Sequence, residues 1–134
     1  YSPLVHVIVV YVTLTGQEGV IEAAALARQI AEIASDSLAR DILVLDIRHL
    51  SPIADYFVIS SVENPRQLRA VTEHIEKELA KENIRPQRRE GVPESGWIVL
   101  DYGDAIVHLF TAEQREFYRL EELWTDAQRL LVIQ

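Results

Sequence analysis

Residues 96–110 read GWIVLDYGDAIVHLF, and this stretch decides the fold because it predicts two short β-strands joined by a tight turn. If Tyr102 and Gly103 are the two turn residues, the strands pair Asp101 with Asp104, Val99 with Ile106, and Trp97 with His108. Two carboxylates that face each other across a hairpin repel, so this pairing needs a nearby positive charge or a splayed turn. A longer loop would shift the register.

The two faces of this hairpin differ sharply in composition. Side chains alternate along a strand, so one face is wholly apolar and is expected to be core: Ile98, Leu100, Ala105, Val107 and Leu109. The other face mixes rings, acids and aliphatic groups: Trp97, Val99, Asp101, Asp104, Ile106, His108 and Phe110. The mixed face suits a protein-binding patch, in which rings supply contact area and carboxylates supply orientation. The alternative is that a helix covers this face and Trp97 is core.

The composition favours one soluble, cytoplasmic domain without a membrane span. The chain has 134 residues and a formal charge of −8, which argues against binding to a nucleic-acid backbone and favours a basic protein partner. It contains no cysteine, so a disulfide framework and a thiolate metal site are excluded. No apolar run reaches the roughly 18 residues of a membrane span.

The chain divides into an apolar extension, residues 1–20, and one domain, residues 21–134. Residues 4–14 read LVHVIVVYVTL, and we expect an extra strand there because no basic residue precedes it as in a signal peptide. Such a strand would need to be covered or paired.

The domain is predicted to be α/β, with a mixed sheet flanked by helices. We expect helices over residues 21–39 and 64–82, and helix in one or two pieces over residues 112–131, where Phe117, Leu120, Leu123 and Trp124 supply the apolar side. Strands are expected over residues 41–47, 56–61 and 87–90, in addition to the hairpin. The helix at 64–82 has a clear start, because Asn64 can cap it, Pro65 fits its first position and Gln67 completes the capping box.

Catalytic and metal sites find little support in the pattern. A metal would have to draw on His49, His108, Asp101 and Asp104, which lack the usual ligand spacing. A nucleotidyltransferase-like enzyme would need a glycine-rich phosphate loop and acids that alternate on one strand, and neither is present. Ser60 and Ser61 end a strand without a local activating group. We therefore expect no catalytic residue, no metal and no cofactor, with a nucleotide-binding or nucleotidyltransferase-like enzyme as the alternative.

A small basic cluster, Arg85, Arg88 and Arg89, is surrounded by glutamates. We interpret it as a charged strand edge that discourages aggregation, with contact to RNA as the alternative.

Four motifs in order resemble the ribosomal silencing factor family, also called the Iojap family. They are residues 46–60 (DIRHLSPIADYFVIS), 66–70 (RQLRA), the hairpin at 96–110, and 117–124 (FYRLEELW), and the resemblance covers roughly residues 21–127. It implies a mixed α/β fold similar to nucleotidyltransferases but without their catalytic motif. It also implies binding to the fourteenth protein of the large ribosomal subunit, which blocks joining of the small subunit and represses translation.

The resemblance also carries over specific residues and a homodimer. It implies a partner-binding surface made of Trp97, Asp101, Tyr102, Gly103, Asp104 and His108, with Leu120 and Trp124 as support. Asp55 and Arg66 match the family pattern too, either as contacts or as a structural pair. Family members often form homodimers when free, so self-association is expected, and a pure dimerisation module is a competing interpretation. We expect no direct DNA binding.

Overall fold

The computed structural model describes residues 18–134, with side chains from Ala23 onward. The extra strand predicted over residues 4–14 lies outside the described residues. Among the helices of the described part, none is both long and apolar enough to cross a membrane.

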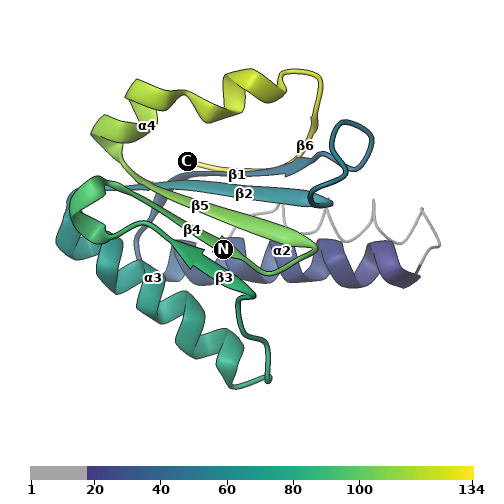
Figure 1. Ribbon diagram of the computed structural model, residues 1–134, viewed down its shortest axis with the longest axis horizontal. Coiled ribbons are helices and arrows are strands. Elements are labelled where there is room, and N and C mark those ends of the chain that lie inside the picture. Colours follow the sequence, from purple (N-terminus) through teal and green to yellow (C-terminus); the bar gives the residue numbers. More distant parts are fainter. Residues whose placement is uncertain (1–17) are drawn as a thin grey trace.

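The elements follow the predicted order through the hairpin, and the sheet is mixed as predicted (Figure 1). The helices are α2 (Glu18–Asp36), α3 (Pro65–Ala80) and α4 (Ala112–Tyr118), with 3-10 turns η1 (Pro93–Ser95) and η2 (Leu120–Trp124). The strands are β1 (Arg40–Asp46), β2 (Tyr56–Val62), β3 (Arg88–Glu90), β4 (Trp97–Asp101), β5 (Ala105–Thr111) and β6 (Gln128–Ile133). Their order in the sheet is β3-β4-β5-β2-β1-β6, with β2 and β5 parallel and the other neighbours antiparallel.

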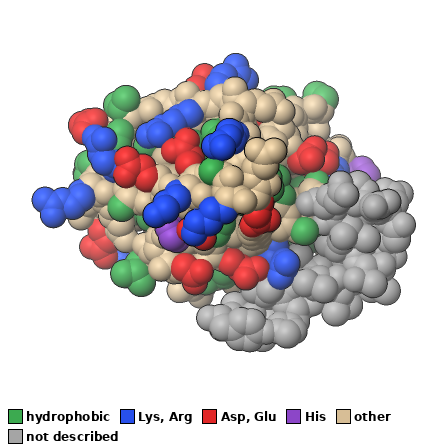
Figure 2. Space-filling model, turned by 90° about the horizontal axis from the view of Figure 1, so that it is seen from below, with side chains coloured by type: hydrophobic (Ala, Val, Ile, Leu, Met, Phe, Trp, Pro, Cys, Tyr) green, Lys and Arg blue, Asp and Glu red, His purple; other side chains and the backbone are tan. Residues whose placement is uncertain are grey.

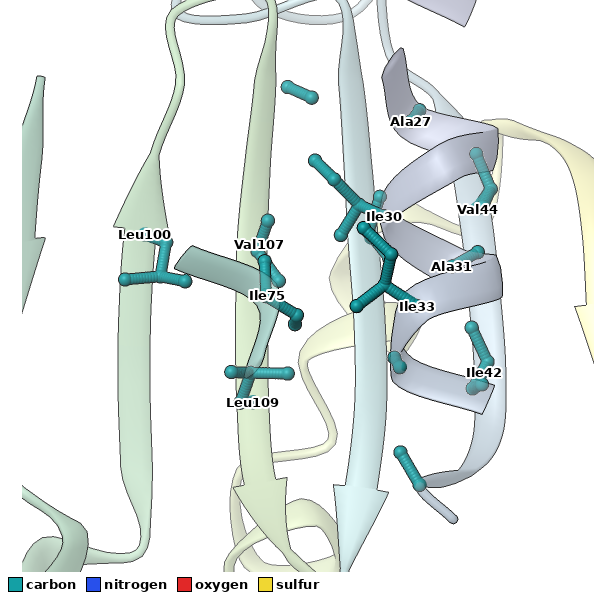
Figure 3. Close-up of a cluster of buried hydrophobic side chains, with 14 of the residues drawn as sticks. Ala27, Ile30, Ala31, Ile33, Ile42, Val44, Ile75, Leu100, Val107 and Leu109 are labelled. Atoms are coloured by element: carbon teal, nitrogen blue, oxygen red, sulfur yellow. The ribbon is translucent and has the colours of Figure 1, made fainter. Parts of the chain in front are cut away.

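Helices α2 and α3 cover one face of the sheet, and α4 with η2 lies over the other (Figure 1). The α2–α3 side holds the larger core, where the small alanines of α2 let its isoleucines approach β1 and β2 closely (Figure 3). The predicted core face of the hairpin lies here, and Ile98, Leu100, Val107 and Leu109 are all fully buried. The second face carries a smaller cluster that includes Phe57, Ile106 and Phe110.

The start of α3 is built as its sequence predicts. The side-chain oxygen of Asn64 accepts a hydrogen bond from the backbone N–H of Gln67 at 2.9 Å. The side-chain oxygen of Gln67 reaches back to the N–H of Glu63 at 2.6 Å. At the other end, Asn83 adopts a left-handed conformation (φ 63°) and closes the helix.

The predicted register of the hairpin is wrong by two residues. The observed pairs are Trp97 with Phe110, Val99 with His108, and Asp101 with Ile106, so Asp101 does not face Asp104. The turn is wider because the N–H of Tyr102 donates to the carbonyl of Ala105 and the N–H of Gly103 donates to the Asp101 carboxylate. An even shift preserves alternation, so the predicted composition of each strand's faces survives.

The prediction of helix over residues 112–131, in one or two pieces, is wrong beyond Trp124. Helix α4 ends at Tyr118 because Arg119 turns left-handed (φ 46°), and the final segment forms β6 on the free edge of β1. Phe117 and Leu123 are exposed, whereas Leu120 and Trp124 pack on the second face of the sheet. Pairing along β1 therefore overrides the local helical pattern of QRLLVI.

Candidate functional site

The second face of the sheet is only partly covered, and its open part forms an apolar groove of about 490 Å³. Its floor comes from β4, β5 and β2, and its rim from β3 and the loop between β1 and β2. Ten residues line it: Ile53, Phe57, Arg88, Glu90, Gly91, Trp97, Val99, Asp101, Ile106 and His108. Five of them lie on the mixed hairpin face, so this face is open to a partner beside the region that α4 and η2 cover.

Trp97 stands at the boundary between the groove and the covered region. Its ring stacks on Phe110 with centroids 4.8 Å apart and contacts Tyr118 of α4 at 4.6 Å. Helix α4 can approach this closely because residue 96 is glycine, where a Cβ would lie 2.5 Å from Cγ of Gln114. Trp97 is thus half-buried, one part of it packing under α4 and another part lining the groove.

His108 is a buried wall of the groove rather than an exposed contact. Its ring is 8% exposed and packs edge-on against Phe57 with centroids 4.7 Å apart. The indole N–H of Trp97 donates to Nδ1 of His108 at 3.3 Å, and burial lowers the pKa of His108 to about 4. The imidazole is therefore neutral near pH 7, and its role is to hold Trp97.

Two acidic residues of the predicted surface lie at the hairpin turn. Asp101 lines the groove, where its Oδ1 accepts the N–H of Gly103 at 2.8 Å and its Oδ2 lies 3.7 Å from the guanidinium of Arg88. Asp104 is exposed in the turn. Asp101 thus orders the turn, and Asp104 is available to a partner.

Asp55 joins the same corner from the loop before β2. Its backbone N–H donates to the carbonyl of Asp104 at 3.0 Å. Burial, and next the Asp104 carboxylate, raise the pKa of Asp55. At the start of the same loop, the guanidinium of Arg48 makes a partly buried, bidentate pair with the carboxylate of Asp46. This pair helps to fix the loop that presents Ile53 to the groove.

Tyr102 does not belong to this surface, which corrects the prediction of a partner contact. Its side chain is 8% exposed and lies in the core on the α2–α3 side, the opposite face of the sheet from Trp97. Burial raises the pKa of Tyr102 to about 12. Gly103 supports the turn in the positive-φ region (φ 87°).

The structure does not bring Asp55 and Arg66 together as a structural pair. Asp55 precedes β2, whereas Arg66 follows it in the exposed first turn of α3, and the seven residues of the strand separate them. Leu120 and Trp124 do lie beside the groove, since Trp124 contacts Phe57 with ring centroids 5.3 Å apart. These two residues support the site from the covered side.

Sequence reasoning missed Ile53, Phe57 and Tyr118. Phe57 sits in a strand buried on both faces, so alternation alone did not say which face it joins; the parallel register with β5 places it beside Ile106. Ile53 is 69% exposed at the rim, and only its position in a loop next to a hydrophobic strand could have marked it.

The structure also shows the surroundings of the residues that the sequence analysis considered as metal ligands, as nucleophiles and as a basic cluster. Within residues 18–134, no group of three His, Asp or Glu side chains is arranged to hold a metal ion. Ser61 accepts a hydrogen bond from the guanidinium of Arg115 at 2.9 Å, which ties α4 to the end of β2. Arg89 of the basic cluster pairs with Glu76 of α3 at 2.9 Å.

Comparisons with known proteins agree with this architecture. A family model described as "Ribosomal silencing factor during starvation" matches residues 20–133. The ribosomal silencing factor RsfS of Bacillus subtilis is 37% identical over 97 residues, which cover 72% of this chain and 82% of that protein. The chloroplastic protein Iojap of Arabidopsis thaliana is 32% identical over 81% of this chain, which spans 45% of that longer protein.

A solved structure from Chromobacterium violaceum superposes with a TM-score of 0.69 at 28% identity, covering 77% of this chain and 83% of that one. The α/β fold with a mixed sheet is thereby confirmed. The family description names a regulatory role on the ribosome rather than a reaction. This chain belongs to the ribosomal silencing factor family.

Proposed function

We propose that this chain binds the large ribosomal subunit through its fourteenth ribosomal protein and sterically blocks joining of the small subunit, which represses translation. Membership of the family supports the ribosome as the target. The observation that carries the proposal is the open groove at Trp97, because it offers a pre-formed apolar surface with an acidic rim on one side of the sheet.

The groove suits a protein partner in size and chemistry. Aromatic and aliphatic walls, which include Trp97, Val99 and Ile106, supply the desolvated centre that interface hot spots need. Trp97 is already held by Phe110 of β5 and Tyr118 of α4, so the surface needs little rearrangement to bind.

The charges around the groove favour a basic partner. Glu90 and Asp101 line it, and Asp104 and Asp55 lie at the adjoining turn, whereas Arg88 is the base at the rim and already pairs with Asp101. With a formal charge of −8 on the whole chain, association with a lysine- and arginine-rich ribosomal protein would be steered electrostatically. On the α2–α3 side, by contrast, acidic and basic side chains are interspersed (Figure 2).

No chemical step is required by this function. A protein that occupies the surface where the large subunit contacts the small subunit represses translation by excluding the small subunit. The residues proposed for this binding contribute apolar contact area or charge. We further propose that the protein acts in the cytoplasm and forms a homodimer when free.

The proposal is tested by sedimenting the purified protein with separated ribosomal subunits. Ile53→Lys places a positive charge at the rim, facing a basic partner, and should weaken binding to the large subunit at least about tenfold. Leu38→Lys is the matched control, because Leu38 is 76% exposed in the turn after α2, on the other side of the sheet. Trp97→Ala is less informative, since it also removes the ring that packs on Phe110 and Tyr118.

Binding of the unmodified protein to neither subunit would refute the proposal. Equal binding by the Ile53→Lys and Leu38→Lys variants would show that the partner contacts another face.

A further inference from the structure

A second apolar feature lies next to the groove, on the segment that covers the rest of this sheet face. The side chain of Phe117 in α4 is 74% exposed, although large apolar side chains are usually buried. It contacts Tyr118 edge-on with centroids 5.0 Å apart, and Tyr118 in turn packs on Trp97 at the groove wall. The exposed ring is thus joined to the groove through two consecutive aromatic contacts.

The fold does not depend on Phe117. Helix α4 is capped by Thr111 at its start and closed by the N–H of Arg119 on the carbonyl of Arg115. Arg115 fixes the helix to the sheet through Ser61 and to η2 through Glu121 at 2.9 Å. Tyr118 supplies the ring contacts with the sheet. An exposed apolar ring that does not contribute to the packing of the fold is a candidate contact for a partner.

The charges of the α4–η2 segment, residues 112–124, identify the kind of occupant. The segment has four glutamates and two arginines, and both arginines are engaged within it, Arg115 with Glu121 and Arg119 with Glu116. A second copy of this acidic chain would bring like charges together here, whereas a basic protein would bring opposite charges. The segment therefore matches the same kind of partner as the groove rim.

We propose that Phe117 and Tyr118 form a second contact site for the basic ribosomal protein that occupies the groove. The partner then contacts the groove on one side of Trp97 and α4 on the other. This inference rests on the proposed function and extends it to residues outside the hairpin. The partner must then present two apolar contacts within one basic surface, one for the groove and one for Phe117.

The test measures the affinity of Phe117→Ala for purified large subunits, with self-association and thermal unfolding of each variant measured in parallel. Loss of an aromatic anchor should weaken large-subunit binding about tenfold or more. Phe117→Leu, which keeps most of the apolar volume, should retain most of the affinity. Leu38→Ala is the control for an equally exposed apolar residue in the turn after α2, and it should bind like the unmodified protein.

Unchanged large-subunit binding by Phe117→Ala, while the unmodified protein binds, would overturn this inference and leave the proposed function standing. Weaker self-association with unchanged ribosome binding would also overturn it, because the occupant would then be a second copy of the chain. Failure of the unmodified protein to bind would refute the proposed function itself, so the two failures are distinguishable.

Discussion

The indole N–H of Trp97 donates a hydrogen bond to Nδ1 of His108, 3.3 Å away on the neighbouring strand. Because Nδ1 is the acceptor, the proton of the neutral imidazole is on Nε2. One buried ring thereby fixes the orientation of the half-buried ring at the boundary of the groove. The contact links the core of the hairpin to the surface proposed for the partner.

Removing the donor of this bond should destabilise the fold measurably. Trp97→Phe leaves the buried Nδ1 without its partner, so we expect the free energy of unfolding in urea to fall by about 1–3 kcal/mol. In a double-mutant cycle with His108→Leu, the coupling energy should be about 1 kcal/mol. Strict additivity of the two changes would contradict a stabilising bond.

Stability should decrease as the pH falls below about 6.5, and His108 should cause part of the decrease. Burial holds the pKa of His108 near 4, below its ordinary value of 6.5, so between these two pH values the unfolded chain binds a proton and the folded chain does not. Proton uptake at His108 therefore leaves the free energy of unfolding unchanged above pH 6.5 and lowers it by about 3 kcal/mol as the pH falls to 4. Urea unfolding from pH 7 to pH 4.5 should show a shallower slope for His108→Gln than for the unmodified protein. Parallel slopes would contradict this assignment.

Tyr102 should behave as a core residue and not as a contact. Its hydroxyl is buried without a hydrogen-bond partner among the described residues, so Tyr102→Phe should leave the free energy of unfolding unchanged or raise it by up to about 1 kcal/mol. Tyr102→Ala should lower it by about 3 kcal/mol. Large-subunit binding by Tyr102→Phe should equal that of the unmodified protein, and a clear loss would return Tyr102 to the partner surface.

Leu38 occupies a backbone position that suits glycine or asparagine. It has a φ of 69° at the end of α2, where the N–H of Ala39 bonds to the carbonyl of Ala34, in the same arrangement that Asn83 makes after α3. Leu38→Asn should therefore raise the free energy of unfolding by roughly 1 kcal/mol, since the left-handed conformation is costly for leucine. A higher melting temperature in calorimetry would agree, and an unchanged or lower one would show that the strain is negligible.

The sequence predicted the layers of this fold better than its local geometry. Alternation along the hairpin correctly placed Ile98, Leu100, Val107 and Leu109 in the core, and three agreeing signals placed the start of α3 at Asn64. The register failed because the turn depends on hydrogen bonds from Tyr102 and Gly103, which residue types alone do not determine. Strand β6 was missed because its pairing with β1 is a long-range contact.

Only the part of the candidate site that lies on the hairpin could be predicted from the sequence. Trp97, Asp101 and His108 do line one groove, because the observed register shift of two residues leaves the members of each hairpin face together. Phe57, Ile53 and Tyr118 come from distant segments, and the topology of the sheet was needed to join them to the hairpin. Tyr102 was misassigned because the wider turn directs its ring into the core.

Subunit joining with a defined order of addition tests the central claim most directly. We expect that adding the protein to large subunits before small subunits prevents assembly of whole ribosomes in proportion to the large subunit bound. Ile53→Lys should then block joining only at concentrations at least about tenfold higher, and Leu38→Lys should act like the unmodified protein. If large subunits saturated with the protein joined small subunits normally, steric silencing through this face would be contradicted.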